Sequence, residues 1–311
     1  MAQPSRMATI VAATDFSGTA EGATDWGAQL ARTHGARLVL VHALLPAVTP
    51  TAAPEFVPLP VEIYEEERRA VKEALEKRAA ALRLTGCTVE TQLEIGPAVS
   101  TILDAIQRCK ADLLVVGTRG LTGFKRILVG STAARLVRDA SCPVLTVHPD
   151  ATRHRPVHRI LVPTDFSQDA ARALEAAGRI LGPVTDHARV TLLHVYRTTQ
   201  DIVTPWPAPV LVDASRDVET EARKLLDETA APLRELGIEV VVQARAGYPP
   251  EVIDEEARRI AADVIAMGTH GRSGLKRLFL GSTAERVLPA APCPVLTVRE
   301  GDGAEATRPS A

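Results

Sequence analysis

The chain has 311 residues, a length that predicts two domains at roughly 150 residues each. Lys and Arg total 36 against 38 Asp and Glu, and the resulting net charge of −2 argues against a nucleic-acid surface or a polybasic membrane patch. Aromatic residues are only 3% of the chain, so stacking platforms for bases or sugars are scarce.

Short β-branched runs alternate with longer helical patterns along the whole chain, which is typical of βαβ units around a parallel sheet. The apolar runs are continuous, which indicates strands buried on both faces. We therefore expect a three-layer α/β fold with helices on both faces of an open sheet. In the first half the predicted strands lie near 8–13, 37–42, 88–93, 112–116 and 143–147. In the second half they lie at 159–162, 190–195, 238–243, 263–267 and 294–298. The helices predicted in the second half lie at 167–181, 213–236 and 250–261, and a last helix begins at 282.

An internal repeat explains why this order of elements occurs twice. The pattern T-D-F-S at 14–17 returns at 164–167, and C-P-V-L-T-V at 142–147 returns at 293–298. More than half of the positions in the windows 117–147 and 268–298 are identical. The chain is therefore a duplicated domain. The predicted boundaries are 1–148 and 158–300 for the domains, 149–157 for a linker and 301–311 for a tail, with Pro-rich surface loops at 46–60 and 204–209.

The cysteines and the hydropathy pattern predict a cytoplasmic protein. Cys87, Cys109, Cys142 and Cys293 form no C-x-x-C pair, which fits neither a disulfide framework nor a zinc site. No apolar run approaches the roughly 18 residues of a transmembrane helix. A short apolar run at 7–13 could imitate a signal sequence, but it stops at Asp15.

A glycine-rich pattern follows the fourth predicted strand of each half and opens the next helix. Glycine lets backbone N–H groups approach an anion closely, and the start of a helix adds the positive end of its dipole. The pattern predicts a phosphate-binding loop, although glycine-rich turns and Ser or Thr caps are common in any α/β protein. Its members are Gly117, Gly120, Gly130, Ser131 and Thr132 in the first half, and Gly268, Gly271, Gly281, Ser282 and Thr283 in the second.

Other polar side chains near these loops leave alternatives open. Lys125-Arg126 and Lys276-Arg277 could pair with phosphate oxygens or form a solvated face, and His270 is the one histidine that we consider for a phosphate contact. His42 and His194 lie on central strands, and we expect them to be hydrogen-bonded core residues rather than catalysts.

An aspartate ends the first strand of each half, at the edge where open α/β sheets place their ligands. A carboxylate there would repel phosphates, so we assign Asp15 and Asp165 to the ribose or base end of a nucleotide. Capping of the following helix is an equally weighted structural role for both residues.

These motifs together resemble the universal stress protein family, in its tandem-domain, ATP-binding type, over about residues 8–148 and 157–299. The resemblance implies a five-stranded parallel sheet of order 3-2-1-4-5 in each half, with ATP across the strand ends. It further implies that Pro163, Asp165, Val195 and Met267 hold adenosine while the second glycine loop holds the phosphates. In the first half Asp15, Val116 and the glycine loop match, but Ala13 and Ala43 replace Pro163 and Val195. We expect both sites to bind ATP, with the second the tighter.

The resemblance predicts a stress-response regulatory protein in which ATP, together with Mg²⁺, orders loops and controls contacts with an unknown protein partner. Slow ATP hydrolysis, autophosphorylation or another nucleotide-using enzyme on the same sheet is the alternative. The chain contains neither G-x-x-x-x-G-K-[ST] nor the S-G-G-x-[DS] loop of ATP pyrophosphatases, and we assign no catalytic residue and no metal ligand. We also expect the halves to pack as a pseudo-dimer through 143–147 and 294–298, and two chains to form a homodimer, because pairing protects a sheet edge.

Overall fold

A computed structural model describes residues 7–45, 48–49, 57–58, 61–118, 129–149, 151, 156–181, 188–197, 214–269 and 280–299. The chain divides into two compact units, one built from Met7–Phe124 and Gly130–Pro149, and the other chiefly from Asp150–Ala311. None of the described helices is both long enough and apolar enough to cross a bilayer.

The first unit is a parallel sheet of five strands in the order β5-β2-β1-β6-β7. Numbered along the chain these are the third, second, first, fourth and fifth strands, which confirms the predicted order 3-2-1-4-5. The strands are β1 (Thr9–Ala13), β2 (Arg37–Leu44), β5 (Thr88–Ile95), β6 (Leu113–Gly117) and β7 (Val144–Val147). The helices are α1 (Gly18–His34), α2 (Val61–Arg83), α3 (Ala98–Cys109) and α4 (Ser131–Asp139).

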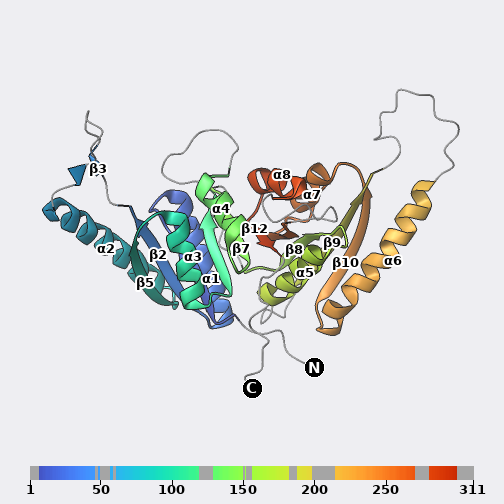
Figure 1. Cartoon of the computed structure of the whole chain (residues 1–311). Helices are drawn as coiled ribbons and strands as arrows, with labels where there is room; N and C mark the ends of the chain where they lie inside the picture. The colour runs from blue at the N-terminus through green and yellow to red at the C-terminus, as the bar shows by residue number, and fades with distance from the viewer. Residues whose placement is uncertain are drawn as a thin grey trace, which may run out of the picture. The chain divides into compact units, whose positions relative to one another are not determined.

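The second unit repeats this topology with the order β10-β9-β8-β11-β12. Figure 1 shows helices along both faces of each sheet, as the continuous apolar strands predict. The strands are β8 (Arg159–Pro163), β9 (Arg189–Tyr196), β10 (Glu239–Ala246), β11 (Val264–Gly268) and β12 (Val295–Val298). The helices are α5 (Gln168–Leu181), α6 (Ala214–Glu235), α7 (Pro249–Arg259) and α8 (Ser282–Ala290).

The core lies on both faces of the inner strands. Ile10, Val11 and Ala12 of β1 are fully buried, and so are Ile160 and Leu161 of β8. The outer strands β5 and β10 are mostly half-exposed, whereas β7 and β12 are buried throughout. The region predicted as a surface loop at 46–60 contains a short antiparallel pair, β3 (Val48–Thr49) with β4 (Val57–Pro58), while 204–209 lies outside the described residues.

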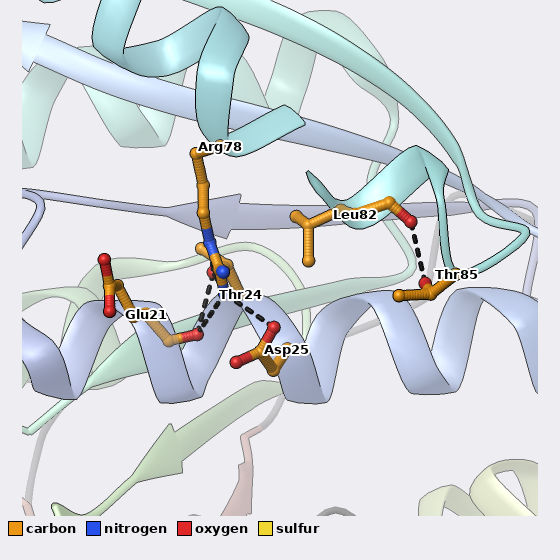
Figure 2. A network of polar contacts seen from close by, with 6 residues as sticks. All are labelled: Glu21, Thr24, Asp25, Arg78, Leu82 and Thr85. Atoms are coloured by element: carbon orange, nitrogen blue, oxygen red, sulfur yellow. Dashed lines mark hydrogen bonds and ion pairs between the residues drawn. The ribbon is translucent and has the colours of Figure 1, made fainter. Parts of the chain in front are cut away.

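One arginine fastens α2 to α1 in the first unit (Figure 2). The Arg78 guanidinium donates to the backbone carbonyl of Glu21 at 2.7 Å and to Asp25 Oδ1 at 2.6 Å. Its Nε also donates to Thr24 Oγ1 at 2.9 Å. Thr24 is fully buried, whereas Asp25 is 33% exposed, so the network runs from the packed interface between the helices to its edge. In the second unit Thr229 takes the place of Arg78 and donates to its own helix, at the carbonyl of Leu225.

Replacing Arg78 by Ala is expected to destabilise the first unit by about 1–3 kcal/mol, since the hydrogen bonds that its guanidinium group donates to Glu21, Thr24 and Asp25 are all lost. Differential scanning calorimetry of the full chain measures the shift of that unit's transition. Arg69→Ala is the matched control, because Arg69 lies on the same helix, is 71% exposed and stands 4.0 Å from Glu66. Equal effects of the two substitutions would contradict the assigned role of Arg78.

Candidate functional site

Each unit has a cavity at the carboxyl ends of its inner strands. The first encloses about 310 Å³ and the second about 190 Å³. The walls come from the ends of the first, second and fourth strands and from the starts of the helices that follow β5 and β6, or β10 and β11. Every predicted site residue within the described part of the chain lines one of them: Asp15, Val116, Gly117, Gly130, Ser131 and Thr132 in the first, and Pro163, Asp165, Val195, Met267, Gly268, Gly281, Ser282 and Thr283 in the second.

Several predicted residues fall outside the described part of the chain, between the fourth strand and the following helix. These are Gly120, Lys125 and Arg126 in the first half and His270, Gly271, Lys276 and Arg277 in the second. Their roles stay predictions.

The T-D-F-S turn places Asp15 at the edge of the sheet. Phe16 has a φ of 62°, an uncommon conformation for a residue with a side chain. Side-chain hydrogen bonds hold this backbone: Thr14 Oγ1 accepts from Phe16 N and Asp15 Oδ1 accepts from Ser17 N, each at 3.0 Å. Ser17 in turn caps α1 by accepting from Ala20 N at 3.3 Å. The Asp15 carboxylate therefore shapes the turn and lines the cavity. Its alternative role from the sequence, capping of the following helix, is taken by Ser17, which is the N-cap of α1.

The second unit has the same turn. Phe166 also has a φ of 62°, and Thr164 and Asp165 accept from Phe166 N and Ser167 N at 3.0 Å. The same uncommon backbone conformation, held in the same way, follows the first strand of both units.

A histidine ring supports each turn from the second strand. His42 Nδ1 lies 2.8 Å from the Thr14 carbonyl oxygen, and His194 Nδ1 lies 2.8 Å from that of Thr164. Phe16 stacks on His42 with ring centroids 4.6 Å apart. Burial lowers the pKa of His42 below its ordinary value, against the opposing effects of the Thr14 carbonyl and of Asp15. The neutral ring is therefore favoured, and His42 serves as the expected hydrogen-bonded support.

Close packing adds a reason for two of the glycines that the sequence analysis assigned to anion binding alone. A Cβ on Gly268 would lie 2.7 Å from the Cβ of Asp169, and one on Gly117 would lie 3.0 Å from Cγ2 of Thr19. The start of α1 or α5 thus packs directly on the end of the fourth strand. Glycine is needed at both positions for this contact, whatever the cavity binds.

The phosphate-binding role also needs a correction in detail. The N–H of Gly130 donates to the Thr118 carbonyl and that of Gly281 to the Thr269 carbonyl, both at 2.7 Å. These two N–H groups are therefore used within the protein. Neither α4 nor α8 has a side-chain N-cap, so the orphan N–H groups of the first turn, beginning at Ser131 and Ser282, are the available donors.

The two cavities differ most on their apolar walls. Val195 and Met267 line the second cavity where Ala43 and Val116 line the first. The larger side chains in the second cavity are consistent with its smaller volume. Ile102 and Ile253 also line the walls, and the sequence analysis missed them. Their matched places in the repeat, after Gly96 and Gly247, were the available signal.

Gly268→Ala is expected to lower stability by about 1–3 kcal/mol, because the added methyl group overpacks the contact with Asp169. Gly117→Ala should cost less, since the nearest atom to an added Cβ is 3.0 Å away there, compared with 2.7 Å at Gly268. Gly18→Ala is the control, because nothing lies within 4 Å of a Cβ there. Calorimetry without nucleotide measures the three shifts, and a Gly268→Ala protein as stable as Gly18→Ala would disprove the packing role.

Comparison with known proteins identifies the family. The model of the universal stress protein family matches residues 7–148 and again residues 156–299. A universal stress protein of Mycolicibacterium smegmatis is 31% identical over 296 residues, which are 93% of this chain and 96% of that protein. Universal stress protein Rv2005c of Mycobacterium tuberculosis is 29% identical over 312 residues, covering 96% of this chain and 100% of that protein.

A solved universal stress protein from Archaeoglobus fulgidus has the same fold. Its TM-score is 0.66, at 24% identity, over 94% of this chain and 97% of that one. The duplicated sheet, the repeated motifs and the double family match agree along nearly the whole sequence. The chain belongs to the universal stress protein family and carries two of its domains in tandem.

Proposed function

We propose that the chain is an ATP-binding regulatory protein with one nucleotide site in each unit. A single observation carries the proposal: the same combination of a carboxylate turn, an apolar wall and an uncapped helix start encloses a cavity twice. An apolar wall with a few convergent polar groups is the usual character of a small-molecule site.

The chemistry of the lining residues fits the parts of a nucleotide. The first turns of α4 and α8 offer N–H groups and the hydroxyls of Ser131, Thr132, Ser282 and Thr283 to the phosphates. Asp15 and Asp165 line the same cavities, and a carboxylate can accept hydrogen bonds from ribose hydroxyls. ATP would bring Mg²⁺ bound to its phosphates, and no group of three or more potential metal ligands occurs among the described residues.

Binding, rather than rapid turnover, follows from the side chains of the cavity. His42 is held against the Thr14 carbonyl, and Ser17 donates to Asp15 at 2.6 Å within the turn. Neither pair aims a nucleophile at the helix start where the phosphates would lie. Nucleotide occupancy would instead control the surface that the protein offers to a protein partner.

The second site should bind ATP about ten-fold more tightly, since a few extra methyl or methylene contacts contribute about 1–2 kcal/mol. Val195 and Met267 supply these contacts. Gly281→Glu should remove the tighter class of sites and Gly130→Glu the weaker one, because each places a carboxylate at the start of the phosphate-binding helix. Both glycines have a φ of −58°, a backbone conformation that Glu adopts without strain.

Isothermal titration calorimetry of ATP against the wild type and both variants tests this order. If Gly281→Glu removes the weaker class of ATP sites instead, the tighter site has been assigned to the wrong unit. Binding unchanged in both variants would contradict the phosphate site, and a wild type that does not bind ATP would overturn the proposed function.

A further inference from the structure

Two arginines flank one tyrosine beside the second cavity. The Arg197 guanidinium carbon lies 5.9 Å from the centroid of the Tyr248 ring, and that of Arg286 lies 5.6 Å from it. Both distances are within the range of about 6 Å for cation–π contacts. Both arginines are exposed and Tyr248 is half-buried. We call Arg197, Tyr248 and Arg286 the rim cluster.

The rim cluster comes from three elements that also build the cavity. Arg197 follows β9, two residues after Val195, and Tyr248 directly precedes Pro249 of α7. Val195 and Pro249 both line the cavity. Arg286 lies one turn after Ser282 on α8, and residues at i and i+4 share a helix face. The cluster is therefore next to the cavity, on the continuation of the face that begins at the proposed phosphate site.

The arginines of the rim cluster carry charges that no ion pair among the described residues balances. In the part of the chain that the structure describes, neither Arg197 nor Arg286 forms an ion pair with a carboxylate. Two guanidinium groups close to one ring repel each other, and an anion between them would relieve this repulsion. Arginine forms paired hydrogen bonds with phosphate, and tyrosine offers a face for stacking of a base.

The first unit provides an internal comparison. Leu45 and Pro97 occupy the places of Arg197 and Tyr248, and only Arg135 matches Arg286. Leu45 is 66% exposed. The first cavity therefore has neither the aromatic face nor the second cation, and the rim cluster belongs to the second unit alone.

We infer that the rim cluster is a second subsite, which makes the second unit selective for a dinucleoside polyphosphate over ATP. This rests on the proposed function, because one nucleoside would occupy the cavity as ATP does. The bridging phosphates extend from the start of α8 towards Arg286 and Arg197, and the second base stacks on Tyr248. The second base would take the place of a guanidinium group over the ring as that group turns to the phosphates, whereas a mononucleotide has no second base and leaves both guanidinium groups over Tyr248.

Calorimetry of the full chain with ATP and with diadenosine tetraphosphate tests the inference. The dinucleotide should bind one class of sites about ten-fold more tightly than ATP does, the size expected for one stacked base. Tyr248→Leu and Arg197→Gln should each abolish this preference and leave ATP affinity unchanged. Arg135→Gln is the matched control in the first unit and should alter neither affinity. Thermal unfolding of each variant checks that it is folded.

The outcomes separate this inference from the proposed function. A wild type without preference for the dinucleotide, or a preference that survives both rim substitutions, overturns the inference while ATP binding stands. Equal weakening of ATP and dinucleotide would make the rim part of the ATP site and also overturns it. Dinucleotide binding that depends on Tyr248, in a protein with no affinity for ATP, would support the rim subsite and contradict the proposed function.

Discussion

The close approach of one helix start to one strand end determines where everything else in each unit lies. The end of β6 meets the start of α1 at Gly117 and Thr19, and the end of β11 meets the start of α5 at Gly268 and Asp169. This contact brings the carboxylate turn, which precedes the helix, beside the loop that leaves the strand. A ligand cavity then forms at the edge between them, as open parallel sheets generally provide.

Duplication preserved this contact while the surroundings diverged. In the first unit, Arg78 of α2 bonds to Asp25 of α1. In the second unit, Thr229 occupies the matching position of α6 and bonds within its own helix. At the cavity, Asp169 replaces Thr19, and it lies 3.5 Å from both Thr269 Oγ1 and an Arg172 nitrogen. This buried carboxylate adds a negative charge close to the proposed phosphate site of the second unit, opposed by Arg172. A tighter binding of ATP by the second site therefore has to come from its apolar wall.

Local patterns in the sequence were sufficient to predict the strands and the helix starts, whereas the strand order and the residues of the apolar wall followed from the resemblance to the family. Apolar runs gave the strands, and the repeated glycine motif gave the helix starts at Ser131 and Ser282. Features that depend on contacts distant in sequence were missed. The sequence predicted an anion-binding role for Gly268 but not its close contact with Asp169. It also did not predict the hydrogen bond from the N–H of Gly281 to the carbonyl of Thr269. The rim cluster was also missed, since Arg197, Tyr248 and Arg286 lie far apart along the chain.

The central claim, that these cavities hold adenine nucleotides, is tested most directly by identifying what the protein carries. The purified full chain would be denatured, and the released small molecules would be identified and quantified by mass spectrometry. The account predicts adenine nucleotides, in amounts that fall when Gly281 is replaced by Glu. Flavin or coenzyme A in stoichiometric amount, with no adenine nucleotide released and no affinity for added ATP, would contradict it.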